Sequence, residues 1–301
     1  MPFGLMTGLG AALSWGTMDI ASALASRRIG SLRVTAGVQL ASSALLVVAA
    51  IATGIAIPSE PGVLAVCGVL GLIGAGAYFA YFTGLRIGPI SVVSGMVAAY
   101  GGLTVVLAVV VRGESLTLTQ ALGAVIATIG VILTGVAFDG GLRATRFAGP
   151  GVVFAVVALV LFALMAITMD VALESAGWLQ VLLLSRLVTA AISTVAVVGV
   201  ALAGRQTAGR AAVGHAPVLE PVQWRRVGAM LAVAGSLDVT GLVAFAIGLS
   251  SAPTWMVGLA SSFGPAVTIL VAVAVLGERL RPIQWLGLIG VAIGMVAIGL
   301  P

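Results

Sequence analysis

Long apolar runs separated by short polar segments dominate the chain. No charged residue occurs in the stretches 34–59, 61–85, 87–111, 115–138, 147–169 and 282–301. Each stretch has about the 20 residues that a helix needs to cross the hydrocarbon core of a bilayer. The runs are continuously apolar, unlike the alternating polarity of membrane β-strands. The pattern therefore predicts an all-α integral membrane protein.

Further spans follow from the remaining apolar segments. The stretch 239–277 is also uncharged, but it is too long for one crossing and carries Pro253 in its middle. Proline is favoured at the first position of a helix, so this stretch is interpreted as parts of two helices. Segments with one or two charges complete a set of ten predicted transmembrane helices, near residues 3–25, 34–57, 62–85, 89–111, 117–138, 148–172, 178–203, 226–249, 253–276 and 283–300.

Composition supports this class and narrows the chemistry. Hydrophobic residues make up 61% of the chain and charged residues 8%, against roughly 25% charged residues in soluble domains. With one cysteine, Cys67, and one histidine, His215, neither an intramolecular disulfide nor a metal site is expected. We expect no cofactor and no nucleic-acid partner. The expected partners are the lipid bilayer and a small-molecule substrate, for a monomer or a homodimer.

The arginines predict how the helices are oriented. All 14 basic residues are arginine, and twelve of them lie in the loops after predicted spans 1, 3, 5, 7 and 9: Arg27, Arg28, Arg33, Arg86, Arg143, Arg146, Arg205, Arg210, Arg225, Arg226, Arg279 and Arg281. The opposite side holds Arg112 alone, and Arg186 lies within a span. Short loops rich in arginine stay in the cytoplasm. We therefore expect a multi-pass protein of the cell (plasma or inner) membrane with both termini outside.

The two halves of the chain resemble each other. One ungapped alignment, the repeat register, matches Gly84, Leu85, Pro89, Gly113 and Glu114 with Gly248, Leu249, Pro253, Gly277 and Glu278. The triplet Thr-Met-Asp also recurs, ending at Asp19 and again at Asp170. These matches predict two repeats of five helices, residues 1–139 and 147–301, with a cytoplasmic linker near 204–225. Because five is odd, the second repeat is inverted, as in many secondary transporters.

Several motifs carry a family resemblance. They are Ser14-Trp15-Gly16, the Gly-Glu pairs that end spans 4 and 9, and the segment LGERLRPIQWLGLIGVAIGMVAIG from Leu276 to Gly299. In these features the chain resembles the ten-helix, EamA-type branch of the drug/metabolite transporter (DMT) superfamily. The resemblance implies a secondary carrier of small organic metabolites, often an exporter of amino acids or related compounds. Many relatives carry a basic residue where this chain has Gln39, the counterpart of Arg186.

Asp238 is the first candidate for a functional acid. It lies about 12 residues into the span 226–249, near the bilayer centre at about 1.5 Å per residue. Acids at that depth usually face a bundle interior or a water-filled cavity. Because burial disfavours the charged form, Asp238 is a candidate proton carrier. The alternative is a structural acid satisfied by Thr240, Ser236 or Arg186.

Arg186 and two further acids complete the intramembrane charges. Arg186 has three candidate partners, Asp170, Glu174 and Asp238. It is interpreted either as part of an internal ion pair that holds spans 6 and 7 together or as a clamp for a substrate carboxylate. Asp19 lies well inside its span, too far along the helix from the arginines that follow it for easy pairing. Asp170 lies near the outer end of its span and is expected to reach interfacial water.

Aromatic and small residues suggest walls and hinges for a site. Candidate substrate-binding residues besides the charged ones are Trp15, Tyr78, Tyr81, Tyr100, Trp255, Ser261 and Ser262. Rings could enclose an apolar group or a cation, although for each ring core or lipid packing is the commoner role. Pro265 and the pair Gly101-Gly102 interrupt corresponding spans. Such paired interruptions point to a binding site or hinge.

These observations favour a secondary active transporter of small organic metabolites that works by alternating access. Acids near the spans outnumber the single intramembrane arginine, which favours a zwitterionic or cationic substrate such as an amino acid or an amine, exported with possible proton coupling. The alternatives are a non-transporting membrane scaffold or receptor subunit and, less favoured, an intramembrane enzyme. Against an enzyme, the chain has neither an HExxH motif nor a Gly-x-Ser-x-Gly turn.

Overall fold

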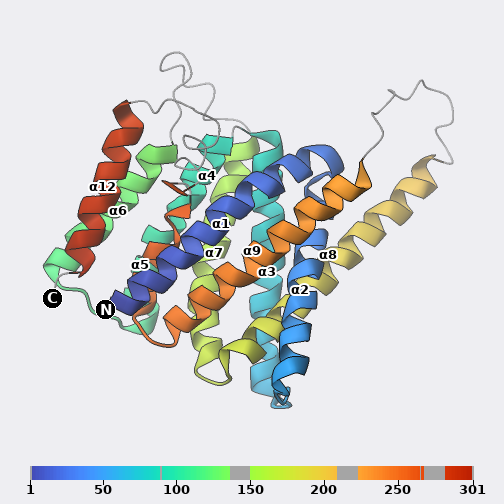
Figure 1. The fold of residues 1–301 in the computed structure, drawn as a ribbon, viewed down its shortest axis with the longest axis horizontal. Helices are drawn as coiled ribbons and strands as arrows, with labels where there is room; N and C mark the ends of the chain where they lie inside the picture. Colours follow the sequence, from blue (N-terminus) through green and yellow to red (C-terminus); the bar gives the residue numbers. More distant parts are fainter. Residues whose placement is uncertain are drawn as a thin grey trace.

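The computed structural model describes residues 2–88, 90–135, 150–208, 223–264, 266–267 and 282–299, and these residues are helical with short connections and no strand. Figure 1 shows the helices as one bundle. They are α1 (Pro2–Ile29), α2 (Ser31–Thr53), α3 (Pro61–Ile87), α4 (Ile90–Ala98), α5 (Tyr100–Arg112), α6 (Leu118–Gly135), α7 (Pro150–Leu173), α8 (Trp178–Ala208), α9 (Trp224–Leu249), α10 (Thr254–Ser261) and α12 (Pro282–Gly299).

Proline and glycine set several helix ends. Proline occupies the first position of α3, α7 and α12, where its missing N–H removes no helical hydrogen bond. Gly54 ends α2 with φ 63° and Gly113 ends α5 with φ 67°. In this left-handed region a side chain would be strained, whereas glycine is not. These residues place the helix ends within a few residues of the apolar runs in the sequence.

Six of the described helical segments are long and apolar enough to cross a membrane: 31–53, 61–87, 93–112, 150–173, 178–203 and 224–249. Two shorter apolar helices cover 118–133 and 285–299. The segment 93–112 includes the junction between α4 and α5, so these two helices form one interrupted span. The predicted all-α membrane class is confirmed, while the number of ten spans stays a prediction.

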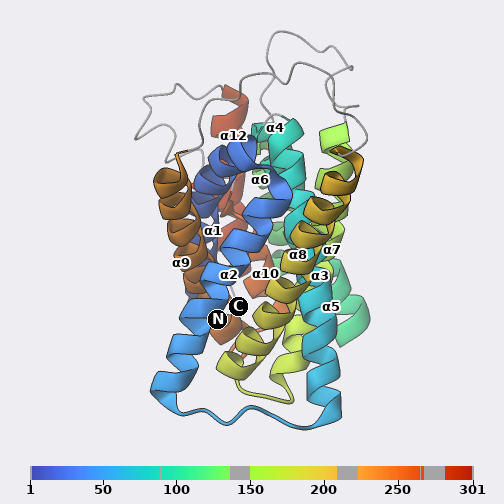
Figure 2. The ribbon, with the colours of Figure 1, turned by 90° about the vertical axis from the view of Figure 1, so that its right-hand side faces the viewer.

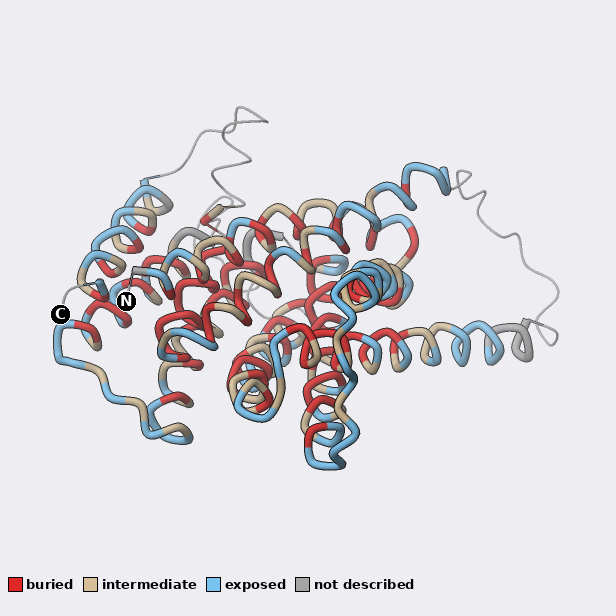
Figure 3. Tube along the Cα trace, turned by 60° about the horizontal axis from the view of Figure 1, so that its bottom comes forward, coloured by how far each residue is buried: buried red, intermediate tan, exposed pale blue. Residues whose placement is uncertain are grey.

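The surface of the bundle is apolar and the interior holds polar groups. Large apolar residues such as Ile51, Val110 and Leu118 are 75 to 77% exposed, and Figure 3 shows exposed positions along the outward faces of the helices. In water such a surface would favour association with other apolar surfaces. In contrast, Asp238 and Gln39 are fully buried. This distribution suits a protein that is surrounded by lipid.

The helix packing repeats between the two halves. The sequence matches equate α1 with α7 and α3 with α9. In the structure α1 packs along α9 and α3 packs along α7, so that exchanging the halves turns one pair into the other. The pairs α2 with α8 and α6 with α12 each map onto themselves. Figure 1 shows α6 beside α12 on the side of the bundle opposite α2 and α8, and Figure 2 shows α2 and α8 from the front.

Side-chain contacts obey the same symmetry. The Thr189 hydroxyl donates a hydrogen bond of 2.9 Å to the carbonyl of Gly71. The Ser42 hydroxyl donates one of 3.2 Å to the carbonyl of Gly235. Gly71 and Gly235 are equivalent positions in the repeat register, the alignment that matches Gly84 with Gly248. The two halves are therefore related in their atomic contacts as well as in their helix order.

We predict that Gly235→Ala destabilises the protein because α2 and α9 touch at this position. An added Cβ would lie 2.5 Å from the Cβ of Ala41, and overpacking of this kind costs about 1–3 kcal/mol. The matched control is Gly228→Ala in the same helix, where an added Cβ meets nothing within 4 Å. The midpoint of unfolding in detergent should fall for Gly235→Ala alone. Equal midpoints for both variants would contradict the close approach.

Two helix interruptions meet inside the bundle. The helix breaks at Ala99, between α4 and α5, and α10 ends at Ser261 with Ser262 as its cap. The breaks are in contact, because the Tyr100 hydroxyl lies 2.7 Å from the Ser261 Oγ. A Cβ added to Gly101 would overlap the Ser262 side chain. Pro265 lies outside the described residues, and the hinge role of this region stays a prediction.

Candidate functional site

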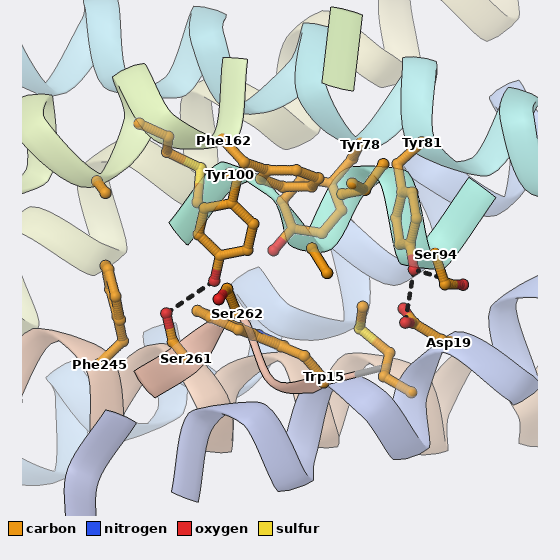
Figure 4. Close-up of a pocket in the computed structure, with 16 residues that line it drawn as sticks. Trp15, Asp19, Tyr78, Tyr81, Ser94, Tyr100, Phe162, Phe245, Ser261 and Ser262 are labelled. Carbon is orange, nitrogen blue, oxygen red and sulfur yellow. Dashed lines mark hydrogen bonds between the residues drawn. The ribbon is translucent and has the colours of Figure 1, made fainter. Parts of the chain in front are cut away.

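A cavity of about 60 Å³ lies between the two halves, next to the helix interruptions. It is bounded by α1, α3, α4, α5, α7, α9 and α10. Figure 4 shows Trp15 on one side and the rings of Phe162, Tyr78 and Tyr100 facing it. The polar or aromatic residues that line the cavity are Trp15, Asp19, Tyr78, Tyr81, Ser94, Tyr100, Phe162, Phe245, Ser261 and Ser262.

The cavity is too small for a metabolite in this conformation. Sites for metabolite-sized ligands typically enclose about 300–1,000 Å³, whereas this cavity holds about 60 Å³. That space suffices for a few water molecules. A metabolite could enter only after the surrounding helices move apart.

Asp19 of α1 supplies the carboxylate of the cavity wall. It is 5% exposed, and its Oδ2 accepts a hydrogen bond of 2.6 Å from the Tyr81 hydroxyl of α3. The Tyr81 hydroxyl also lies 3.4 Å from the Ser94 Oγ of α4. Within the part of the chain that the structure describes, no salt bridge reaches Asp19. A buried carboxylate without a cation favours binding a proton or a positively charged group.

The aromatic wall is organised around a residue that the sequence did not single out. Phe162 of α7 packs its ring against three tyrosines, with centroid distances of 5.4 Å to Tyr78, 5.8 Å to Tyr81 and 5.9 Å to Tyr100. The signal lay in the alignment of the two Thr-Met-Asp triplets: Phe162 precedes Ala166, the counterpart of Trp15, by four residues. Residues four apart share a helix face, so the alignment could have placed Phe162 at the cavity.

Phe245 of α9 is a second cavity residue that was not predicted from the sequence. Its ring centroid lies 5.6 Å from that of Trp15 in α1. The two rings are therefore neighbours in the cavity wall. Phe245 is the counterpart of Tyr81 in the repeat register. The predicted aromatic residue Trp255, in contrast, does not line the cavity. It is 1% exposed and packs in a separate apolar cluster with Ala12 and Phe263.

Asp238 and Arg186 form a buried ion pair beside the cavity. The Arg186 Nη2 lies 3.4 Å from the Asp238 Oδ1. Asp238 Oδ1 also accepts a hydrogen bond of 2.7 Å from the Tyr78 hydroxyl, and its Oδ2 accepts one of 2.7 Å from Ser42. Neither charged residue lines the cavity. These contacts favour the interpretation of Asp238 as a structural acid. Its partner Arg186 was among those predicted, whereas Tyr78 and Ser42 were not.

Arg186 has two further hydrogen-bond partners, Gln39 and Tyr78. Its Nη1 donates to the Gln39 Oε1 at 2.8 Å, and its Nη2 donates to the Tyr78 hydroxyl at 2.9 Å. The Cζ lies 4.8 Å from the centroid of the Tyr78 ring. The expected ion pair between spans 6 and 7 is therefore corrected: Arg186 of α8 pairs with Asp238 of α9. Gln39, its counterpart in the first repeat, accepts a hydrogen bond from it.

Asp170 and Glu174 pair with a different arginine. The Arg112 Nε lies 2.7 Å from the Asp170 Oδ2, and the Arg112 Nη2 contacts the Glu174 Oε1. These ion pairs join the end of α5 to the end of α7, so Asp170 does more than reach interfacial water. The counterpart of Arg112 in the second repeat is Leu276. Asp170 and Asp19, the acids of the two Thr-Met-Asp triplets, therefore differ: among the described residues, Asp170 has an arginine partner and Asp19 has none.

We predict that Asp170→Asn lowers the midpoint of unfolding more than Glu174→Gln does. The Asp170 side chain is 13% exposed, whereas that of Glu174 is 58% exposed. Exposed ion pairs contribute about 0.2–1 kcal/mol and are screened by salt. Thermal unfolding in detergent at low and high salt checks this, with Arg112→Gln as the variant that removes both pairs. An equal or larger effect of Glu174→Gln would contradict the ranking.

A further carboxylate holds the start of α10. Glu114 Oε1 accepts a hydrogen bond of 2.8 Å from the backbone N–H of Thr254, and its Oε2 accepts one of 3.0 Å from that of Trp255. A carboxylate at a helix N-terminus is favourable there. The Gly-Glu pair after α5 therefore links the first half to the second.

Among the described residues, no group of three His, Cys, Asp or Glu side chains could hold a metal ion.

Comparison with known proteins gives the family. None of the curated proteins compared with the chain matches it. A solved structure titled "Crystal structure of protein" is 21% identical, with 99% of this chain and 98% of that chain covered and a TM-score of 0.75, which shows a shared fold. The model of the EamA-like transporter family matches twice, at residues 2–136 and 149–300. Because these two repeats cover almost the whole chain, the protein belongs to the EamA-like transporter family of the DMT superfamily.

Proposed function

We propose that the protein is a secondary active transporter that exports small organic compounds bearing an amine, such as amino acids or amines, by alternating access. The observation that carries the proposal is the small cavity between the halves, with the carboxylate of Asp19 in its wall. Sites of secondary transporters commonly lie at the interface of inverted repeats. Family membership supports the transport of small molecules across a membrane.

The proposed topology has ten spans in two inverted repeats, 1–139 and 147–301, with a cytoplasmic linker near 204–225. It places both termini outside the cell membrane. The paired packing of α1 with α9 and of α3 with α7 supports the two-fold relation between the repeats. The distribution of arginines supports the orientation. A reporter fused to the C-terminus that is active only in the cytoplasm would overturn this orientation.

Alternating access is proposed to use the interrupted helices as hinges. Gly101 and Gly102 follow the break between α4 and α5, and Pro265 is their proposed partner in the second repeat. The Tyr100 hydroxyl and the Ser261 Oγ bridge the two interruptions across the cavity. Movement at these breaks would therefore change the shape of the cavity directly. Paired breaks at the midplane are a recurring device in transporters.

Proton coupling is proposed to act through Asp19. Among the described residues it is the carboxylate that lines the cavity, whereas Asp238 is paired with Arg186. The groups that face Asp19 from neighbouring elements are Tyr81 of α3 and Ser94 of α4, with Tyr100 of α5 further along the wall. A proton and a cationic substrate would compete for the same carboxylate, which couples their movements in opposite directions.

The test is flux through the purified protein in liposomes. Radiolabelled amino acids, amines and nucleosides are compared with and without a pH gradient, against liposomes that lack protein. We expect substrate-dependent flux that a pH gradient accelerates. If no compound in the screen crosses the membrane through the protein, the transport proposal fails. Flux of nucleosides alone would leave transport standing and would overturn the amine class.

A further inference from the structure

We infer that the transported compounds are organic amines that carry a positive charge and no carboxylate. This inference rests on the proposed transport function and narrows its substrate class. It selects amines over amino acids, which the sequence leaves open. Three features support it: the charges that line the cavity, the aromatic character of its walls and the contacts of Arg186.

The charge balance of the cavity favours a cation. Among the described residues that line it, Asp19 is charged and no arginine is present. The Asp19 Oδ2 is bonded to the Tyr81 hydroxyl, and no hydrogen bond to its Oδ1 is found among the described residues. A protonated amine has up to three N–H donors and the opposite charge. Such a group would satisfy the second carboxylate oxygen and offset its burial.

A carboxylate on the substrate would find no cationic partner in the described cavity. Arg186 is 3% exposed, and both of its terminal nitrogens already donate hydrogen bonds, to Gln39, Tyr78 and Asp238. Its Cζ lies over the Tyr78 ring, at 4.8 Å from the centroid. Releasing Arg186 toward a substrate would leave Asp238 buried without its cation, which is strongly unfavourable. Arg186 is therefore not available as a clamp.

The aromatic walls of the cavity also favour a cation over a carboxylate. The faces of aromatic rings carry partial negative charge, so they attract cations and repel carboxylates. Rings of Trp15, Tyr100, Phe162 and Phe245 line the cavity, and their apolar area suits a hydrocarbon body attached to the amine. An amino acid would place its carboxylate against these faces and within the same cavity as Asp19. Burial of an unpaired charge makes that arrangement costly.

The decisive experiment compares three forms of one molecule. Phenylalanine, its decarboxylated product 2-phenylethylamine and its methyl ester share a ring and an amine, and they differ in the carboxylate. Leucine, isoamylamine and leucine methyl ester form a second, non-aromatic set. Flux in proteoliposomes should be at least about tenfold higher for the amine and the ester than for the amino acid. Tenfold corresponds to about 1.4 kcal/mol of discrimination, a modest demand for an unpaired buried charge.

A binding readout separates recognition from movement. At saturating concentration a ligand that binds the folded protein raises its midpoint of unfolding. We expect 2-phenylethylamine to raise the midpoint in detergent and phenylalanine to leave it unchanged. In Asp19→Asn the amine should lose this effect. Because Asp170 is paired with Arg112 away from the cavity, Asp170→Asn serves as the matched control and should keep it.

The outcomes distinguish failure of the proposed substrate class from failure of the proposed transport function. Flux of the amino acids equal to that of the amines would overturn the inference and leave the transport function intact. Flux of other compounds, with none of either set, would overturn it as well. Absence of flux for every compound in the wider screen would overturn the transport function itself. A midpoint raised equally by the amine in wild type and in Asp19→Asn would remove Asp19 from the site.

Discussion

Asp19→Asn is expected to reduce proton-driven transport to the background of protein-free liposomes, while the protein still folds and inserts. Asparagine keeps the size of the side chain and can accept the hydrogen bond from Tyr81 that Asp19 accepts at 2.6 Å. It cannot take up a proton or pair with an amine. Because Asp19 has no ion-pair partner among the described residues, its neutralisation leaves no buried cation uncompensated. The loss should therefore appear in transport and not in stability.

Two variants make this expectation specific. Asp170→Asn changes the acid of the second Thr-Met-Asp triplet, which is paired with Arg112 and does not line the cavity, and it should retain proton-driven flux. Asp19→Glu keeps the charge on a longer side chain and should restore part of the activity. Flux is measured with an imposed pH gradient, alongside the midpoint of unfolding of each variant. Full activity of Asp19→Asn would exclude the assignment of Asp19 as the coupling acid.

Much of the fold follows from the sequence because helix length and the polarity of lipid constrain it strongly. The repeat register, read from sequence matches such as Gly84 with Gly248, correctly relates the contacts of Gly71 and Gly235. An internal repeat predicts packing as well as order, since equivalent helices must bury equivalent faces. The break at Ala99 fell next to the predicted interruption at Gly101-Gly102. Breaks of this kind are readable because glycine weakens a helix locally.

The site was harder to predict because depth along a helix does not reveal lateral partners. Asp238 is deep and fully buried, but its charge is met by Arg186, which lies on another helix. Asp19 lies nearer the end of its predicted span, yet it lines the cavity. Asp170 pairs with Arg112, whereas the residue equivalent to Arg112 in the second repeat is Leu276, which carries no charge and cannot pair with an acid. Comparing charged residues between the repeats would have predicted this contrast, whereas depth could not.

The second large effect is expected at the buried ion pair. Arg186→Gln removes the cation and leaves the Asp238 carboxylate, which is fully buried, without it. Breaking a buried pair by removing one partner typically costs about 3–5 kcal/mol, because the remaining charge is uncompensated. Asp238→Asn should be similarly damaging, since Arg186 would keep its charge at 3% exposure. Both single variants should show a large fall in the midpoint of unfolding in mixed micelles.

The double variant Arg186→Gln, Asp238→Asn decides what the pair does. It removes both charges while it keeps groups that can bond to Tyr78, Ser42 and Gln39, the present neighbours of the pair. We expect it to be more stable than either single variant, with a coupling of about 2–3 kcal/mol. The corresponding cycle at Arg112 and Asp170, which is partly exposed, should give less than about 1 kcal/mol. If the pair is structural, the double variant also transports amines. A stable double variant without transport would instead place Asp238 or Arg186 in the transport mechanism.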